Sequence, residues 1–447
     1  MIRKQFDVLV IGGGISGTLA AAYLAGKGRK VGVLKKGGGA TAMSSGLLDV
    51  LGYVDEELIR NPEEGVRSLA EQNPDHPYGI TGGGREESAS ERGQVAVKRL
   101  REALDFFRAG VKAAGHEYKG SLDENVLAIT PFGTYKPTCL LPPWMYSDIS
   151  RLDGSKILFV GSKNNPRVNP VYIAKSFEGF ILPKLREIGI EIEAEAEAEY
   201  VGAPGLEDRR YILPIEVGYS LDVSENLREY TENISQKLGD STHVFLPCLG
   251  YRKPRENWEY MKEKLGVEVV ELPSLPPSTA GMRLAACLEE MASKEGVELY
   301  KGYSAVSAEV EGSKCFSVEA AHRNEVSEVE ASAFVLATGD YISDDLLVEK
   351  DRIIERAFGL TIETPEDQDY LSWLDDTPFP VSGHPASRLG VKVDRAMHPL
   401  VKGDVLAENL FACGSIIAGY DYNTEKCGFG VCISTALAAA EGVLDYL

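Results

Sequence analysis

The most constraining part of the sequence is residues 6–17, FDVLVIGGGISG. Its apolar, β-branched run predicts a strand buried on both faces of a parallel sheet. Gly12, Gly14 and Gly17 have the spacing G-x-G-x-x-G, and good helix formers follow at residues 18–25. In this motif the first glycine allows a tight turn, the second lets a phosphate approach the backbone, and the third lets helix and strand pack closely. The stretch therefore predicts an anion site at a helix N-terminus.

A second strand, expected at residues 30–34, completes a βαβ unit, and this context favours nucleotide or flavin binding over a plain glycine turn. About twenty residues after the glycines, an acidic side chain normally holds the ribose hydroxyls of an adenosine. Lys35 and Lys36 stand there instead, and the next acid is Asp49. Because an ammonium group accepts no hydrogen bond, the sequence disfavours an NAD-type adenosine. Either the ribose is held in another way, or the ligand lacks adenosine and ends in a phosphate that Lys35 or Lys36 pairs with.

A strip of small residues follows at positions 37–46 and includes Ser44, Ser45 and Gly46. Small side chains let backbone and hydroxyl groups lie against a flat ligand without a steric clash. The strip is a candidate for flavin contact, and a mobile surface loop explains it equally well.

Two later strands also end in glycine. The strand expected at residues 328–336 is followed by Gly339, and a strand at residues 409–414 ends in Gly414. Gly428 and Gly430 then open a helix at residues 431–447, and the dipole of such a helix suits the negative charge of a reduced flavin. The carboxyl ends of parallel strands meet at one edge of a sheet, so the three glycine bends point to one crevice. This pattern favours a flavin over a generic nucleotide.

With 447 residues, the chain suggests two domains, one inserted into the other. We expect an α/β fold of the Rossmann-like FAD/NAD(P)-binding flavoprotein type with an inserted α/β domain. The first part of the flavin-binding domain is expected at residues 1–60, an inserted substrate or partner domain at 61–270, and the second part of the flavin-binding domain at 271–447. Inside the insert we expect strands at 156–161, 190–194, 244–247 and 267–272, and helices at 171–188, 219–237 and 257–265. Before and after them we expect a helix at 91–113, another from about residue 282, and a meander of strands at 305–310, 315–320 and 328–336.

The formal net charge of −21 argues against nucleic acid and anionic lipid as partners. The acidic run at residues 191–199, EIEAEAEAE, is interpreted as a solvated face. No run of eighteen uncharged apolar residues occurs, so no membrane span is expected. The first strand leaves no room for a signal peptide, and seven cysteines fit reduced thiols better than a disulfide framework. These features predict a cytoplasmic protein.

Several polar residues are candidates for binding an anionic substrate. Arg283 is expected in the first turn of a helix, where the dipole disfavours a cation, which suggests an anionic partner, with a surface arginine as the alternative. His76 lies beside a proline in a turn-rich stretch, with an exposed or capped histidine as the alternative to a substrate or partner role. Arg388 lies in a loop-rich segment before the last strand and is a candidate to face the crevice, with no role assigned. Cys413, Cys427 and Cys432 form the one local cysteine cluster, but their spacing fits no zinc or iron–sulfur pattern, so no metal is expected. Buried packing thiols are the simpler interpretation, and a redox or cluster-adjacent role is the alternative.

The chain resembles the family formed by the B subunits of anaerobic glycerol-3-phosphate dehydrogenases. The resemblance runs from the first strand to the last helix. The motifs that carry it are VIGGGISG, MSSGLLDVL at 43–51, HPYGITG at 76–82, ITPFGT at 129–134, LPSLPPSTAGMRL at 272–284, NLFACGSIIAGYD at 409–421 and CGFGVC at 427–432.

This resemblance implies a three-part complex. A separate FAD subunit oxidises sn-glycerol 3-phosphate to dihydroxyacetone phosphate, this subunit carries a flavin described as FMN, and an iron–sulfur subunit passes electrons toward membrane quinone. The chain itself is then cytoplasmic and reaches the inner face of the membrane through a partner subunit. Lys35 and Lys36 agree with FMN, whereas the glycine motif also suits the pyrophosphate of FAD. Two other hypotheses remain: a self-sufficient flavin dehydrogenase or oxidase of a small anionic substrate, and a structural adaptor with a vestigial flavin site.

Overall fold

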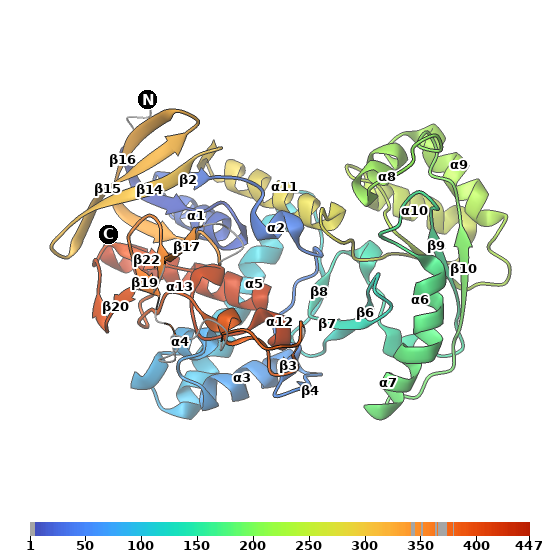
Figure 1. The fold of residues 1–447 in the computed structure, drawn as a ribbon, viewed down its shortest axis with the longest axis horizontal. Coiled ribbons are helices and arrows are strands. Elements are labelled where there is room, and N and C mark those ends of the chain that lie inside the picture. Colours follow the sequence, from blue (N-terminus) through green and yellow to red (C-terminus); the bar gives the residue numbers. More distant parts are fainter. Residues whose placement is uncertain (1–4, 341–344, 350–351, 363, 365–372, 379) are drawn as a thin grey trace. The chain divides into compact units, whose positions relative to one another are not determined.

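The computed structural model describes the chain except residues 1–4, 341–344, 350–351, 363, 365–372 and 379 (Figure 1). It divides into two compact units. Unit 1 comprises Met1–Thr41, Asp49–His116 and Ala285–Leu447, and unit 2 comprises Ala42–Leu48 and Glu117–Leu284.

The inserted unit therefore differs in its bounds from the insert expected at residues 61–270. Helices α3 (Pro62–Gln72), α4 (Pro77–Thr81) and α5 (Ala89–Ala113) belong to unit 1. The apolar face of α5 packs on α3 and on the last helix, α13 (Gly428–Tyr446). The amphipathic pattern of residues 91–113 correctly predicted a half-buried helix, but a pattern of this kind does not say which partner covers the apolar face.

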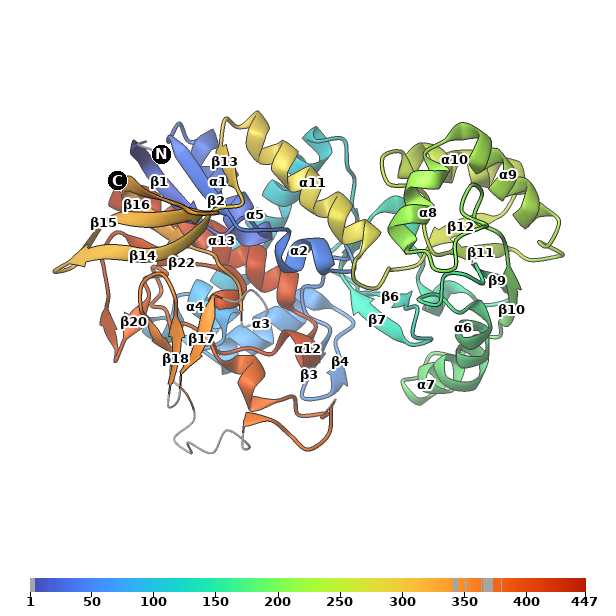
Figure 2. The same cartoon turned by 45° about the horizontal axis from the view of Figure 1, so that its top comes forward.

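The sheet of unit 1 has the strand order β13-β2-β1-β16-β15-β14, and β22 pairs with β16 beyond the end of β15. Strands β13, β2, β1, β16 and β22 run parallel, and β16, β15 and β14 form the expected antiparallel meander (Figure 2). The bounds are β1 (Gln5–Ile11), β2 (Val31–Lys35), β13 (Glu298–Lys301), β14 (Ser304–Glu311), β15 (Lys314–His322), β16 (Glu325–Leu336) and β22 (Leu410–Ala412). Strand β13 was not anticipated from the sequence.

Helices α1 (Ile15–Gly26) and α13 pack against each other beside this sheet, and both are apolar on nearly all sides (Figure 1). By length and composition α13 is able to cross a membrane, although 61% of it is buried inside the protein. Val431, Ala436 and Ala439 on this helix are fully buried. Burial in the core of unit 1 accounts for the apolar character of α13.

Unit 2 contains its own parallel sheet, with the order β10-β9-β11-β12. Its strands are β9 (Lys156–Gly161), β10 (Glu195–Tyr200), β11 (His243–Leu246) and β12 (Glu268–Glu271). Its main helices are α6 (Pro170–Ser176), α7 (Leu182–Glu187), α8 (Pro214–Leu221), α9 (Ser224–Ser235) and α10 (Pro254–Leu265). Helix α6 lies along β9 and β10 (Figure 1).

Two expectations about unit 2 were wrong in detail. The strand expected at residues 190–194 lies at β10 instead, within the acidic run, where the glutamates point to solvent and alternate with half-buried alanines. The helix expected at residues 219–237 is interrupted between α8 and α9. Asp222 occupies this break, and its carboxylate accepts hydrogen bonds from the backbone N–H groups of Tyr251 and Arg252.

Candidate functional site

The carboxyl ends of β1, β16 and β22 lie at one edge of the unit 1 sheet. Ile11 of β1 is in register with Leu336 of β16, which is in register with Ala412 of β22. Each strand then continues into a glycine bend with positive φ: Gly12 at 115°, Gly339 at 95° and Gly414 at 83°. The register alone therefore brings the three bends together, as the sequence pattern predicted.

Close packing explains three of the motif glycines. A Cβ at Gly12 would overlap the carbonyl oxygen of Ala337 at the end of β16, and one at Gly17 would overlap the carbonyl oxygen of Gly12. A Cβ at Gly414 would overlap the hydroxyl of Ser16 on α1. These contacts hold α1 and the bends after β1, β16 and β22 in one tight arrangement.

Gly14 is different because there is room around it. It is the N-cap of α1 with φ −78°, and the nearest atom to an added Cβ would be the Thr41 hydroxyl oxygen at 3.5 Å. That same oxygen accepts a hydrogen bond from the backbone N–H of Ile15 at 2.9 Å. Gly12, Gly13 and Gly14 all remain partly exposed. The turn is thus an accessible cradle of bare backbone at a helix N-terminus, which suits a phosphate.

Two buried hydroxyl groups test whether a polar ligand fits this edge. The Thr338 Oγ1 and Tyr420 Oη atoms are shielded from solvent and have no hydrogen-bond partner among the described residues. Thr338 lies directly before the Gly339 bend, and Tyr420 follows β22. Buried hydroxyl groups are normally hydrogen-bonded, so two hydroxyl groups without a partner among the described residues fit a ligand with polar atoms at this edge, such as a flavin.

Lys35 ends β2 and is buried, and its ammonium group is already paired. Its Nζ lies 2.5 Å from Glu289 Oε1 on α11 (Thr279–Lys294), and Lys301 Nζ lies 2.5 Å from Glu289 Oε2. Burial acts to raise the pKa of Glu289, but the hydrogen bonds from Lys301 and Lys35 outweigh it and hold the pKa below its usual range. The stem of Lys35 also covers Gly13, since a Cβ there would lie 2.6 Å from the Lys35 stem. Lys36 is exposed next to it.

Ser44, Ser45 and Gly46 belong to unit 2, whereas Gly12, Gly339 and Gly414 belong to unit 1. The Ser44 hydroxyl accepts a hydrogen bond from the backbone N–H of Gly46 at 3.2 Å, and Gly46 has φ 74°. A Cβ at Gly46 would lie 2.7 Å from Ala280. Ser44–Gly46 therefore form a compact turn within unit 2, whereas residues 37–41 of the strip belong to unit 1, and contact of the strip with a flavin stays a prediction.

Gly428 and Gly430 lie in the first turn of α13. A Cβ at Gly430 would overlap the Tyr78 hydroxyl, and its backbone N–H donates a hydrogen bond to the carbonyl oxygen of Asp49 at 2.8 Å. Protein atoms therefore fill the space beside Gly430. Gly428 is less crowded, with Tyr422 Cβ 3.3 Å from an added Cβ.

His76 takes part in a buried cluster with Glu425 and Cys427. The ligand atoms of these three residues lie within 4.8 Å of one another, as in a metal site. However, His76 Nδ1 accepts a hydrogen bond from the backbone N–H of Tyr78 at 3.1 Å, which places the ring proton on Nε2, 3.2 Å from Glu425 Oε2. The Cys427 thiol donates to the same oxygen at 3.2 Å. The cluster is closed by its own hydrogen bonds, and we assign no metal to it.

Burial acts to raise the pKa of Glu425, but the hydrogen bonds from His76 and Cys427 and the charge interaction with His76 together outweigh it and hold this pKa below its usual range. Burial raises the pKa of Cys427 well above its usual value, and that of Cys432 to about 11. The pKa of Cys413 is raised by burial as well. All seven cysteines of the chain are free. These thiols stay protonated near neutral pH, consistent with packing roles.

Arg283 lies in unit 2 and is engaged inside the protein. Its Nη1 lies 2.7 Å from Glu271 Oε1, and its Nη2 lies 3.0 Å from Glu271 Oε2 and also donates to the carbonyl oxygen of Gly250. The side chains of Arg283 and Glu271 are only 4% and 1% exposed. This pairing leaves little charge for an external anion. Arg388, in contrast, is exposed in a short 3-10 helix, Pro385–Arg388.

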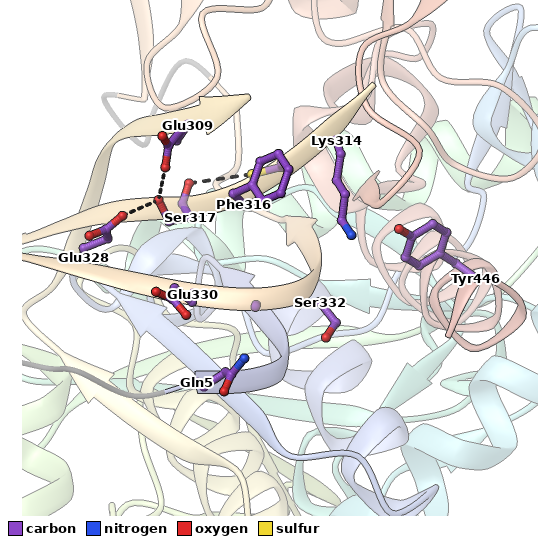
Figure 3. Close-up of a pocket in the computed structure, with 11 residues that line it drawn as sticks. Gln5, Glu309, Lys314, Phe316, Ser317, Glu328, Glu330, Ser332 and Tyr446 are labelled. Carbon is purple, nitrogen blue, oxygen red and sulfur yellow. Dashed lines mark hydrogen bonds between the residues drawn. The ribbon is translucent and has the colours of Figure 1, made fainter. Parts of the chain in front are cut away.

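A separate cavity of about 480 Å³ lies beside the meander of unit 1 (Figure 3). Its wall includes Glu309 and Glu328, whose carboxylates lie 3.2 and 2.8 Å from the hydroxyl of Ser317. It also includes Gln5, at the amino end of β1, whereas the glycine bend is at the carboxyl end, about 20 Å along the strand. This acidic cavity is distinct from the glycine edge.

The chain is similar to a known domain family and to named relatives. A family model described as FAD binding domain matches residues 7–431. The chain is 28% identical over 445 residues to a Vibrio vulnificus protein named as the B subunit of anaerobic glycerol-3-phosphate dehydrogenase, covering 98% of this chain and 96% of that protein. A protein of the same name from Pectobacterium carotovorum is also 28% identical, over 98% of this chain and 99% of its own length. A solved flavocytochrome c3 fumarate reductase aligns with 99% of this chain and 79% of its own at 11% identity, with a TM-score of 0.44, too low to support an argument.

Proposed function

Since this chain belongs to the FAD-binding domain family, we propose that it is the flavin-carrying, electron-transferring subunit of an anaerobic glycerol-3-phosphate dehydrogenase complex. The family confirms the expected flavoprotein fold and places the chain among flavin-dependent oxidoreductases. The observation that carries the proposal is the convergence of the Gly12, Gly339 and Gly414 bends beside two unpartnered, buried hydroxyl groups. Such an edge holds a flat, polar ligand by its backbone and needs few charged side chains.

In this proposal the N-terminus of α1 holds the flavin phosphate over Gly14, with Thr41 fixing the first turn of the helix. The bends at Gly339 and Gly414 face the ring, and Gly428 at the start of α13 brings a second helix dipole to it. A bound flavin supplies the ability to take up two electrons and pass them on one at a time. The chain contributes binding, orientation and exclusion of water.

We further propose FMN as the flavin, with FAD as the alternative. The end of β2 offers Lys35, already paired with Glu289, where a carboxylate would normally accept the hydroxyl groups of an adenosine ribose. The family description names FAD, so the identity of the flavin is a direct test. The mass of the flavin released by heating the purified protein decides it: FMN supports this part of the proposal, and FAD refutes it while leaving the electron-transfer role intact.

The partners in this proposal are a catalytic FAD subunit, which oxidises sn-glycerol 3-phosphate to dihydroxyacetone phosphate, and an iron–sulfur subunit, which passes electrons toward quinone at the membrane. The names of the curated relatives describe one subunit of a larger enzyme. The cationic candidate Arg283 is neutralised by Glu271, and His76 points its proton at Glu425. Because both residues are engaged inside the protein, neither is available to bind the phosphate group of the substrate. This favours a partner subunit, rather than this chain, as the site where the substrate is oxidised.

A pair of glycine variants tests the site. Gly14→Ala adds a methyl group that the fold accommodates but that stands in the proposed path of the phosphate. We expect flavin affinity to fall at least tenfold with an unchanged unfolding midpoint, as measured by flavin fluorescence titration and circular dichroism. Gly179→Ala in unit 2 is the control, because an added Cβ there meets no atom within 4 Å. Equal affinity in wild type and Gly14→Ala would refute the proposed phosphate position.

The electron-transfer role is tested with the purified, flavin-loaded chain, glycerol 3-phosphate and an artificial electron acceptor. We expect no turnover by the chain alone and reduction of its flavin once the catalytic subunit is added. Robust turnover by the chain alone would favour the self-sufficient dehydrogenase. A colourless protein after flavin supplementation, with no flavin released by heat, would favour the structural adaptor.

A further inference from the structure

The Tyr420 side chain is unusual because a polar group is buried at the glycine edge without a use inside the protein. Its residue is 3% exposed, and its ring packs edge-on against the ring of His76 with 6.1 Å between centroids. Its hydroxyl has no hydrogen-bond partner in the described part of the chain. The backbone before it is fixed, since the N–H of Gly419 donates to the carbonyl oxygen of Arg388 at 3.1 Å.

The surroundings of this hydroxyl place it among the converging segments. Asp340 directly follows the Gly339 bend, and Cys427 and Cys432 belong to the start of α13. All three residues are close enough to act electrostatically on Tyr420. Burial raises the pKa of Tyr420 well above 10, and these neighbours raise it further. The phenol therefore stays protonated and can donate one hydrogen bond.

The Gly414 bend and α1 lie close to the same place. A Cβ added at Gly414 would overlap the hydroxyl of Ser16 on α1 and would lie 4.0 Å from Cys432 Sγ, so both side chains lie beside this bend. Tyr420 is thus linked through Cys432 to α1 and the bend after β22, and through Asp340 to the bend after β16. The flavin ring proposed for this edge carries carbonyl oxygens and ring nitrogens along its polar side, and these atoms are acceptors for a donor at this meeting point.

We propose that the Tyr420 hydroxyl donates a hydrogen bond to the polar edge of the flavin ring and so fixes the ring in its crevice. This inference rests on the proposed flavin-binding function. A buried hydroxyl without a partner costs stability in the ligand-free state. A hydrogen bond to the flavin would give this hydroxyl an acceptor that the described residues do not supply.

Unit 2 provides a matched control. Tyr230 on α9 is also fully buried, and its hydroxyl also has no hydrogen-bond partner in the described part of the chain. Its neighbours belong to the apolar core of unit 2, among them Leu227, Ile234 and Val244. Tyr420→Phe and Tyr230→Phe therefore remove the same atom from equally buried positions, one at the glycine edge and one in an apolar core.

The experiment measures flavin affinity by fluorescence titration, the visible spectrum of the bound flavin, and the thermal midpoint of the flavin-free protein. For Tyr420→Phe we expect affinity to fall about tenfold, a loss of about 1.4 kcal/mol, with a shifted flavin spectrum and an equal or higher midpoint. For Tyr230→Phe we expect an equal or higher midpoint with wild-type affinity and spectrum.

Two results would overturn the inference. Wild-type affinity and spectrum in Tyr420→Phe would show that the hydroxyl does not contact the flavin. A lower midpoint of flavin-free Tyr420→Phe, or its failure to fold, would show that the hydroxyl has a structural partner inside the protein. If the wild-type chain bound no flavin, the proposed function itself would fail, and this outcome is separate from both.

Discussion

The two units each contain a parallel sheet, but the carboxyl edges of these sheets are built differently. In unit 1 three strands, β1, β16 and β22, continue into glycine bends at residues 12, 339 and 414, and the nearby hydroxyls of Thr338 and Tyr420 are left unpartnered among the described residues. In unit 2 β12 ends in Glu271, whose carboxylate holds Arg283 and also accepts the backbone N–H of Leu249 at 2.8 Å. The first edge keeps backbone and hydroxyl groups available for a ligand, whereas the second uses its charged groups to fix its own loops.

The largest expected effect therefore comes from the ion pair of unit 2. Glu271→Ala leaves the guanidinium of Arg283 buried without its carboxylate, and we expect the free energy of unfolding to fall by about 3–5 kcal/mol. Denaturant unfolding followed by circular dichroism measures it. The double variant Glu271→Leu/Arg283→Met is the control and should regain most of this loss, because apolar replacement of both partners removes the buried charge. A loss below about 1 kcal/mol in Glu271→Ala would contradict the structural role of the pair.

The next effect concerns the glycine edge of unit 1. Gly12→Ala combines a φ of 115° with an overlap onto the carbonyl oxygen of Ala337, so we expect a loss of about 3 kcal/mol of stability together with loss of flavin binding. Gly14→Ala, at φ −78°, should lose flavin binding alone. Thermal unfolding of both variants without flavin separates the two cases. Equal midpoints would show that the bend at Gly12 is less constrained than the structure indicates.

The sequence predicted unit 1 better than unit 2 because the evidence for unit 1 is local. A buried strand followed by glycines specifies both the strand and its bend, so β1, β16 and β22 were located correctly, and their parallel register brings the bends together. In unit 2 the Glu–Ala alternation of β10 is a strand signal of period two, but it was interpreted only as a charged surface. The exposed glutamates of β10 agree with a charged surface. The half-buried alanines between them show that alternate residues face the protein, as they do in a strand.

The sequence could not predict hydrogen-bonded pairs of side chains that lie far apart along the chain. His76 and Glu425 are 349 residues apart, and Lys35 and Glu289 are 254 residues apart, so no local pattern connects them. A motif identifies a residue such as Lys35 as available to a ligand, but only the fold shows that another side chain has already neutralised it. The same reasoning applies to Arg283, whose partner is set by the end of β12.

A smaller effect tests the pairing of Lys35. Glu289→Gln removes the carboxylate shared by Lys35 and Lys301, and we expect a loss of about 1–2 kcal/mol near neutral pH. The folded-state pKa of Glu289 is depressed, so its contribution is present above the unfolded-state pKa of about 4.3 and disappears as the pH falls through the folded-state pKa. Glu290→Gln is the control on the same helix, because Glu290 forms an exposed ion pair with Lys294 and should matter little. If Glu289→Gln left stability unchanged, Lys35 would be free to bind a cofactor phosphate.

The smallest effect contrasts one histidine from each unit. The hydrogen bond to Asp394 raises the pKa of His398 in unit 1, whereas burial lowers the pKa of His243 in unit 2. His398 therefore stabilises the fold below the unfolded-state pKa of about 6.5, and this gain is lost as the pH rises through its raised folded-state value. His243 has the opposite effect. Because its pKa is higher in the unfolded chain, protonation in acid favours unfolding and lowers the stability of the fold. We expect His398→Gln to lower stability and His243→Gln to raise it in acid, each by less than about 1 kcal/mol and each fading toward higher pH. Denaturant unfolding at a series of pH values measures both, and parallel pH profiles in the two variants would contradict the opposite environments of these residues.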